Sequence, residues 1–332
     1  LMKILITGAG GFIGSHLTEK LVREGYNVKA MVEYNSLNSW GWLEQCDPDI
    51  KGHFEVFMGD IRYSDSVEKA LNNTNVIIHL AALIGIPYSY VSPQSYIDTN
   101  IKGTHNLLQS AIKNGVEKFI HTSTSEVYGT AKKIPIKENS TLDGQSPYAA
   151  SKISADQLVN SYFKSFQLPT LTIRPFNTYG PRQSNRAILP TLITQFLLNK
   201  KNLIIGNLSP TRDFNYIDDT VEAFSKALKI KKNFGETINI GSGDEISIKN
   251  SIRVIEEIFK KKMVINYDKK RFRPKKSEVP RLCADNLKAK KILNWKPKYK
   301  GKDGFKKGLK KTIAWFSEKK NLDLYKTNIY NF

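Results

Sequence analysis

Residues 3–14 read KILITGAGGFIG, an apolar run followed by glycines in the spacing G-x-x-G-x-x-G. The apolar run predicts a strand over Lys3–Thr7, and the pattern that follows predicts a helix over Ile13–Glu24. Glycines at such a turn let the backbone approach a pyrophosphate, and the start of the helix offers free N–H groups and partial positive charge. Glycine-rich turns also occur for structural reasons alone, but this strand–turn–helix context favours a bound dinucleotide. The residues expected to hold it are Gly8, Gly11, Phe12, Ile13 and Gly14.

Short apolar runs alternate with amphipathic stretches through the first half of the chain. This alternation is typical of a parallel sheet wrapped by helices, so we predict an α/β fold with a Rossmann-type doubly wound parallel sheet and a smaller mixed α/β substrate-binding lobe. Further strands are predicted at Asn27–Val32, His53–Met58, Val76–Leu80, Lys118–Thr122, Thr170–Arg174 and Thr237–Ile240, and further helices at Tyr96–Asn114, Tyr148–Phe166 and Ile248–Lys262.

Pro181, Pro190 and Pro210 interrupt the pattern after Pro175, where loops and short helices are expected. We predict a dinucleotide-binding domain over residues 1–176, with returning segments near 211–228 and 237–245. Residues 177–210 and 246–332 are predicted to form the substrate-binding lobe.

The composition of the 332 residues limits the classes of function. No apolar stretch reaches the roughly 20 residues of a membrane helix, and no signal-peptide pattern opens the sequence, so a cytoplasmic protein without membrane association is expected. Cys46 and Cys283 lie far apart and have no ligand partner at metal-binding spacing, so neither a disulfide framework nor a metal site is expected.

The net charge of +20 belongs to one end of the chain. Residues 226–332 hold 30 Lys and Arg against 11 Asp and Glu, whereas the first 225 residues have a net charge of +1. Runs such as Lys260–Lys262 and Lys306-Lys307 lie beside helical apolar spacing, which favours a solvated lysine face over a nucleic-acid site. No nucleic-acid partner is expected.

Acidic and small residues at the predicted strand ends refine the cofactor. Glu33 ends the second strand, close to the ~20-residue offset at which a carboxylate accepts hydrogen bonds from the adenosine ribose. A carboxylate there repels the extra phosphate of NADP, so NAD is predicted, although Glu33 could also be an exposed loop residue. Later strands end at residues expected to face the same ligand, namely Asp60, Ile61, Leu80, Ala81 and Ala82.

Tyr148 and Lys152 form the pair expected to carry the chemistry. Their i, i+4 spacing places a phenol and an ammonium on one helix face, where the cation favours the phenolate and suits Tyr148 to exchange a proton with a substrate hydroxyl. Tyr128 and Lys132 have the same spacing, but Gly129 and Pro135 argue against a helix there.

Together these motifs resemble the extended short-chain dehydrogenase/reductase family over nearly the whole chain. The matching stretches are Gly8–Gly14, Gly59-Asp60, His79–Ala82, Asn100 with Gly103-Thr104, Thr122–Gly129, Tyr148 with Lys152, and Arg174–Pro181. Members of that family oxidise a ring carbon of a nucleotide sugar transiently, and dimers formed by helices like Tyr148–Phe166 are usual among them. The resemblance therefore implies a nucleotide-sugar substrate and a homodimer.

The same resemblance assigns further residues. It places Thr124 against the sugar O4, with Asn177 and Arg212 at the substrate phosphates and Arg273 as a second phosphate-binding arginine. Each of these could instead be a surface arginine or a loop asparagine. It adds Leu189 and Glu278 to the substrate site, and Asn35, Ser36, Thr99, Ser123, Pro175 and Asn177 to the cofactor site alongside Tyr148 and Lys152.

The sequence Thr124-Ser125-Glu126 bears on the reaction. A 4-epimerase has no task for Glu126, whereas a 4,6-dehydratase needs a base for the C5 proton. UDP-glucuronate decarboxylases share Thr-Ser-Glu, so that reaction stays open. The segments 34–42 and 209–216 are most similar to NAD-dependent 4,6-dehydratases of legionaminic acid biosynthesis, which act on GDP- or UDP-N-acetylglucosamine. Tyr148, Lys152, Thr124, Ser125 and Glu126 are the expected catalytic residues, and a regulatory NAD-binding protein on the same fold is the alternative of a different class.

Overall fold

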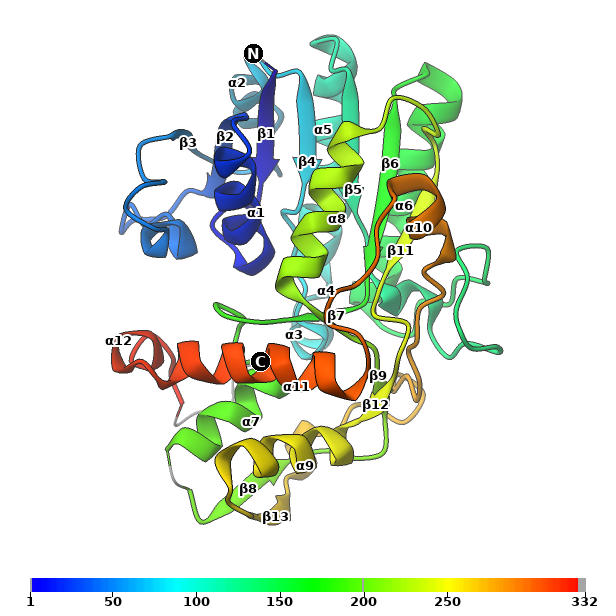
Figure 1. Ribbon diagram of the computed structural model, residues 1–332. Coiled ribbons are helices and arrows are strands. Elements are labelled where there is room, and N and C mark those ends of the chain that lie inside the picture. The colour runs from blue at the N-terminus through cyan, green and yellow to red at the C-terminus, as the bar shows by residue number, and fades with distance from the viewer. Residues whose placement is uncertain (1, 199, 328–332) are drawn as a thin grey trace.

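A seven-stranded parallel sheet forms the centre of the computed structural model, which describes residues 2–198 and 200–327. The order of its strands is β11-β6-β5-β4-β1-β2-β3 (Figure 1). Strands β2 and β3 are added on one side of β1, and β4, β5 and β6 are added on the other side. The strands are β1 Lys3–Thr7, β2 Asn27–Glu33, β3 Phe54–Gly59, β4 Val76–His79, β5 Lys118–Thr122, β6 Thr170–Pro175 and β11 Thr237–Ile240. The predicted α/β class and doubly wound parallel sheet are confirmed.

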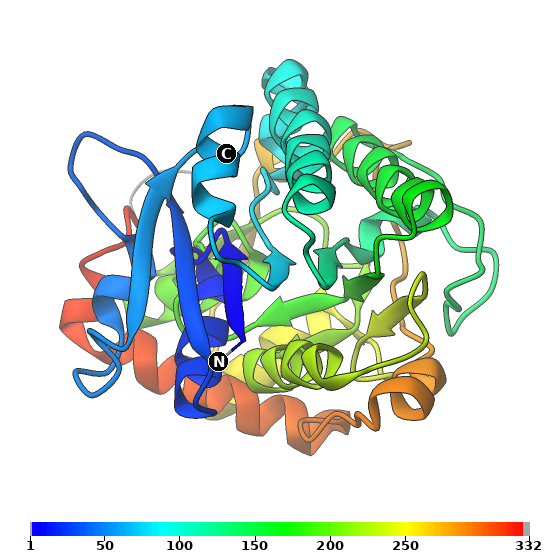
Figure 2. The same cartoon turned by 90° about the horizontal axis from the view of Figure 1, so that it is seen from above.

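Alternate residues of the central strands supply two separate hydrophobic cores. Ile4 and Ile6 of β1 pack on one face of the sheet, and Leu5 packs on the other. Helices α1 (Phe12–Arg23) and α8 (Ile217–Lys229) cover the first face, and α2 (Ser64–Leu71), α5 (Gly103–Lys113) and α6 (Pro147–Phe166) cover the second, as the view from above shows (Figure 2). Burial on both faces explains why these strands are continuous apolar runs.

A second group of elements lies beyond the carboxyl ends of the strands (Figure 1). In this second group β8 (Asn202–Ile205) pairs with β13 (Val264–Tyr267). Three helices of the group pack together: α7 (Ile188–Leu197), α9 (Ile248–Phe259) and α11 (Gly301–Ser317). Shorter elements are η1 Gly41–Gln45, α3 Ile86–Val91, η3 Ser125–Tyr128, β7 Asn177–Tyr179, β9 Thr211–Arg212, β10 Phe214–Tyr216, β12 Ile246–Ser247, η4 Lys269–Arg271, α10 Leu287–Leu293 and α12 Lys319–Leu322.

The chain crosses between these two layers more than once. Helix α8 packs against α1, and β11 completes the edge of the sheet beside β6. Of the segments predicted to return to the first domain, helix α8 and strand β11 lie with the sheet, whereas β9 and β10 pair with β12 and β7. The division at residue 176 itself stays a prediction, and the outer ends of the predicted ranges, residues 1 and 328–332, lie outside the described residues.

Two predicted helices differ from the structure. The helix expected over Ile248–Lys262 ends at Phe259, because Lys260 adopts the left-handed conformation (φ 51°) and its N–H bonds back to Glu256. The helix expected over Tyr96–Asn114 is instead assembled from α4 (Pro93–Tyr96), a π-helical turn η2 (Ile97–Lys102) and α5. Other predicted boundaries agree to within one residue, and β13 was not predicted.

Several expected features can be located on the described residues. None of their helices has both the length and the apolar character needed to cross a bilayer. No group of three or more His, Cys, Asp or Glu side chains in this part of the chain could hold a metal ion, and Cys46 and Cys283 are buried and unpaired with each other. Lys260, Lys262 and Lys307 are exposed, which agrees with a solvated lysine face.

Candidate active site

A cleft of about 1260 Å³ opens at the carboxyl ends of the strands, between the sheet and the second layer. In a doubly wound sheet this edge is where ligands bind. The structure brings every site residue expected from the sequence to the lining of this one cleft: Gly8, Gly11, Phe12, Ile13, Gly14, Glu33, Asn35, Ser36, Asp60, Ile61, Leu80, Ala81, Ala82, Thr99, Ser123, Thr124, Ser125, Glu126, Tyr148, Lys152, Pro175, Asn177, Leu189, Arg212, Arg273 and Glu278.

The glycine turn forms a backbone cradle between β1 and α1. Gly8 adopts φ +70°, and a Cβ there would lie 2.7 Å from the Ala81 nitrogen; a Cβ on Gly14 would lie 2.7 Å from the Ala9 Cα. Gly11 precedes the helix, and no side chain caps the first turn of α1. Because the first-turn N–H groups of a helix lack intrahelical acceptors, the cradle fits an anionic pyrophosphate.

Glu33 lies at the end of β2 and is exposed to the cleft. The neighbouring cation Arg62 is already engaged, since its Nε and Nη2 donate hydrogen bonds to the Asp60 carboxylate at 2.9 and 2.5 Å. Desolvation opposes this pair, but the hydrogen bonds from Arg62 hold the pKa of Asp60 below its usual value. The Asp60 carboxylate is therefore paired with Arg62, whereas Glu33, which Arg62 reaches only through space, is exposed to the cleft.

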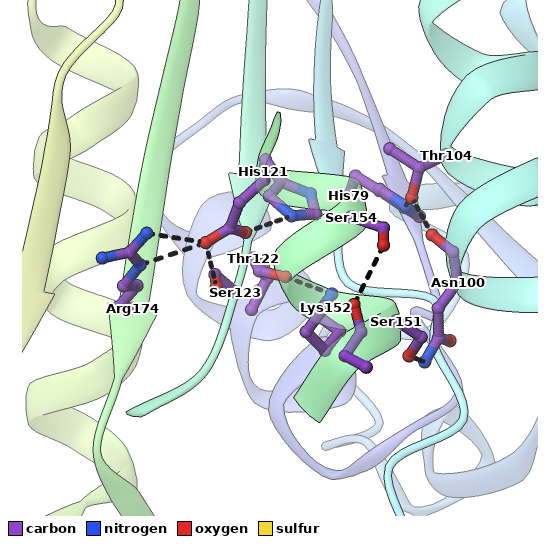
Figure 3. A network of polar contacts seen from close by, with 12 residues as sticks. His79, Asn100, Thr104, His121, Thr122, Ser123, Ser151, Lys152, Ser154 and Arg174 are labelled. Atoms are coloured by element: carbon purple, nitrogen blue, oxygen red, sulfur yellow. Dashed lines mark hydrogen bonds and ion pairs between the residues drawn. The ribbon is translucent and has the colours of Figure 1, made fainter. Parts of the chain in front are cut away.

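Tyr148 and Lys152 project from the start of α6, as the spacing predicted. Ser146 caps this helix, its Oγ accepting a hydrogen bond from the Ala149 N–H. The Lys152 Nζ donates to the Thr122 carbonyl oxygen at 2.7 Å (Figure 3). The competing pair, Tyr128 and Lys132, does not share a helix, because η3 ends at Tyr128. The Tyr128 hydroxyl donates a hydrogen bond to Asn239.

The electrostatics of Tyr148 differ from the sequence expectation. Burial raises the pKa of Tyr148 above its usual value, and Glu126 adds to this effect while a hydrogen bond with Thr124 opposes it. Burial lowers the pKa of Lys152 to about 8, partly offset by Asp156. In the protein by itself, burial therefore outweighs the hydrogen bond from Thr124, which is the contact that favours the phenolate.

Thr124 and Glu126 are positioned by the short helix η3, directly after β5. The Thr124 Oγ1 accepts a hydrogen bond from the Glu126 N–H at 3.2 Å, so Thr124 caps the turn that carries the glutamate. The Glu126 side chain is largely buried and lies near Tyr148. This turn therefore places a carboxylate beside a phenol at the inner end of the cleft.

Two arginines from the second layer reach the same cleft. The Arg212 Nη1 donates to the Val279 carbonyl oxygen, and its Nη2 lies 3.2 Å from Glu278 Oε1. The Arg273 Nη1 is 3.7 Å from Glu126 Oε2 and 4.0 Å from Glu278 Oε1, and it has no hydrogen-bond partner although it is buried. The Oδ1 of Asn177 is also buried without a partner. These unsatisfied polar atoms fit a ligand with phosphate and hydroxyl groups.

Sequence reasoning missed some residues of the cleft. Arg186 lines it beside Gly85 and Tyr96, and the Tyr96 ring packs against Tyr148 with centroids 6.2 Å apart. Asn100 supports the same wall by hydrogen bonds to both backbone groups of Leu83. The sequence marks Asn100 only as part of a family motif and assigns it no role in the site. No local pattern marks Arg186, which lies in the loop after β7.

This combination of sheet, glycine cradle and buried tyrosine–lysine pair defines a dinucleotide-dependent enzyme class of the short-chain dehydrogenase type. The model of the GDP-mannose 4,6 dehydratase family matches residues 5–308. The chain belongs to that family of extended short-chain nucleotide-sugar dehydratases and epimerases.

Similar proteins carry out several different reactions. The dTDP-D-glucose 4,6-dehydratase of Homo sapiens is 33% identical over 327 residues, which cover 95% of this chain and 90% of the human protein. The UDP-N-acetyl-alpha-D-glucosaminuronate decarboxylase of Bacillus cytotoxicus is 32% identical, covering 96% and 99% of the two chains. The solved UDP-glucuronic acid 4-epimerase of Bacillus cereus, in complex with UDP-glucuronic acid and NAD, has a TM-score of 0.86 and 34% identity over 98% of this chain and all of that one.

Proposed function

We propose that the protein is an NAD-dependent nucleotide-sugar 4,6-dehydratase that converts GDP- or UDP-N-acetylglucosamine to its 4-keto-6-deoxy derivative, and that it belongs to legionaminic acid biosynthesis. The observation that carries the reaction is the Glu126 carboxylate beside Tyr148, held by the Thr124-capped turn. The likeness of segments 34–42 and 209–216 to the dehydratases of that pathway supports the sugar.

The roles of the side chains follow from the groups that they offer. Tyr148, in its phenolate form, accepts the proton of the sugar O4, and Thr124 hydrogen-bonds the same oxygen. Once C4 is a ketone, the C5 proton is acidic, and Glu126 removes it. Glu126 then protonates the departing C6 hydroxyl, directly or through Ser125, and water is lost.

Bound NAD would supply the acceptor for the C4 hydride and the donor that returns this hydride to C6 after water has left, while C5 takes a proton from solvent. The glycine cradle at Gly8 to Gly14 would hold the pyrophosphate, and Glu33 would accept hydrogen bonds from the ribose hydroxyls. The Lys152 ammonium donates a hydrogen bond to the Thr122 carbonyl oxygen, which holds it in place on the same helix face as Tyr148.

Glu33→Arg should shift cofactor preference from NAD toward NADP. The change removes the acceptor of the ribose hydroxyls and adds a partner for a 2′-phosphate. Dissociation constants for both dinucleotides, measured by calorimetry, check the result. Preferential binding of NADP by the unaltered protein would contradict the role given to Glu33.

Arg273→Ala should weaken binding of UDP or GDP by about 1.5 to 3 kcal/mol, as expected for one lost charge-assisted hydrogen bond. Arg212→Ala should have a similar effect on binding, with an added loss of stability because this buried arginine also bonds the Val279 carbonyl. The matched control is Lys260→Gln with Lys262→Gln, two exposed charges outside the cleft lining. If the lysine changes weakened binding more than the arginine changes, the diphosphate would lie elsewhere.

Two other reactions suit parts of the same site. A decarboxylase of UDP-glucuronate shares Thr124-Ser125-Glu126, and a 4-epimerase needs only the tyrosine. A regulatory NAD-binding protein would have no use for the Tyr148–Lys152 pair. Assays of GDP-, UDP- and dTDP-sugars for a 4-keto product separate these functions. Assembly as a homodimer and a cytoplasmic location stay predictions.

A further inference from the structure

A buried carboxylate outside the proposed chemistry lies one helical turn beyond Lys152. Asp156 follows Tyr148 and Lys152 at the i+8 and i+4 positions of α6, and its side chain is 4% exposed. Its Oδ1 is 3.1 Å from the His121 Nε2, and its Oδ2 accepts hydrogen bonds from the Ser123 Oγ at 2.8 Å and from Arg174. A carboxylate with so many partners in a buried site is held in one position.

These contacts hold the end of β5 on both sides of one residue. His121 and Ser123 flank Thr122, whose carbonyl oxygen accepts the hydrogen bond of Lys152. Figure 3 shows His121, Ser123 and Arg174 converging from β5 and β6, with Thr122 and Lys152 beside them. Asp156 thus holds the residues on both sides of the Thr122 carbonyl that anchors the lysine. Thr124, which follows Ser123, begins the turn that carries Glu126.

Asp156 is also the counter-charge of two buried cations. Arg174 donates hydrogen bonds to Asp156 through Nε and Nη2 at 3.1 and 2.8 Å. The Lys152 ammonium interacts with the Asp156 carboxylate electrostatically. The groups facing this cluster are Tyr148 on α6, His121 on β5, His79 on β4, Arg174 on β6 and Glu126 on η3. Burial lowers the pKa of His121 to about 4 and the pKa of His79 also falls, so both rings are neutral near pH 7.

We propose that Asp156 is a positioning residue for the Tyr148–Lys152 pair: through His121 and Ser123 it holds in place the Thr122 carbonyl to which Lys152 donates. This role rests on the proposed use of Tyr148 and Lys152 in proton transfer. It predicts how the pair responds to loss of the negative charge. An anion favours the lysine cation and disfavours the phenolate, so its removal lowers the pKa of both groups.

The test compares Asp156→Asn, which removes the charge, with Asp156→Glu, which keeps the charge but moves the carboxylate. In protein labelled with nitrogen-15 lysine, NMR follows the titration of Lys152, assigned with Lys152→Arg. We expect the Lys152 midpoint of Asp156→Asn to fall by about 1 to 2 pH units, the usual effect of a nearby opposite charge. The pH profile of turnover of Asp156→Asn should move to lower pH. The reason is that Tyr148 and Lys152 interact, so that the apparent pKa values of turnover belong to the pair, and both fall.

Asp156→Glu should lower turnover at every pH without moving either midpoint. A second neutral variant, Asp156→Asn with Arg174→Met, removes both members of the ion pair and so avoids an unpaired buried arginine. A smaller downward shift is expected from it, because loss of the Arg174 cation offsets part of the lost negative charge. The lysine titration does not depend on the sugar, so it remains informative even if no 4-keto product is formed.

An unchanged Lys152 midpoint in either folded neutral variant would overturn the proposal. So would failure of both neutral variants to fold while Asp156→Glu folds with normal turnover, since Asp156 would then have only a structural role.

Discussion

Tyr148→Phe is expected to lower turnover by about 10²- to 10⁴-fold, the usual contribution of a positioned acid–base group. The Tyr148 phenolate is the group proposed to take the O4 proton, and phenylalanine keeps the ring that packs edge-on against Tyr96. Binding of nucleotide and dinucleotide should therefore change little. Steady-state rates, together with calorimetric binding constants, separate this loss of chemistry from a loss of binding.

Tyr128→Phe is the matched control for this experiment. Tyr128 is also a buried tyrosine with a lysine four residues later, but its hydroxyl donates to Asn239 and accepts from Arg174, and it does not line the cleft. Its loss should lower thermal stability and leave turnover nearly intact. Full turnover by Tyr148→Phe, or loss of turnover in a well-folded Tyr128→Phe, would contradict the assignment of the proton acceptor.

Glu126→Gln should stop the reaction after its first half. Oxidation at C4 needs Tyr148, Lys152 and the dinucleotide, whereas elimination also needs a group that takes the C5 proton. The variant should accumulate a bound 4-keto hexose and reduced cofactor, seen by its near-ultraviolet absorbance, and form the 6-deoxy product about 10²- to 10⁴-fold more slowly. Tyr148→Phe should accumulate neither.

Glu138→Gln controls for the loss of a partly buried glutamate outside the cleft. Glu138 accepts a hydrogen bond from the Asn239 N–H and does not line the cleft. This variant should lose stability but still form product. If Glu126→Gln formed the 6-deoxy sugar at the normal rate, another group would have to remove the C5 proton.

The parts of the fold with strong local signals could be predicted from sequence. Strands such as Lys3–Thr7 are continuous apolar runs, because both faces of the sheet are covered, and the glycine turn has a spacing that few other structures require. The expected NAD cofactor agrees with a structural relative, which holds NAD in its crystal structure. Lys260 shows the limit of such signals, since a lysine in the left-handed conformation ends α9 where propensity alone would continue the helix.

The polar surroundings of the site could not be predicted, because they join residues far apart in the sequence. Asp156 meets Arg174 of β6 and His121 of β5 only after the sheet has formed. The pKa of Tyr148 depends on how deeply the phenol is buried, which the i, i+4 spacing does not reveal. Arg186 could not be predicted either, because it meets Gly85 and Tyr96 only in the folded chain.

We expect the unaltered protein to remove a C5 proton after oxidising C4. Turnover of GDP- or UDP-N-acetylglucosamine in D₂O, followed by NMR of the product, tests it directly. A 4-keto-6-deoxy sugar carrying deuterium at C5 is expected, because the 5,6-alkene must take its new C5 hydrogen from solvent. Carbon dioxide release from UDP-glucuronate, or simple inversion at C4 without loss of water, would contradict the claim.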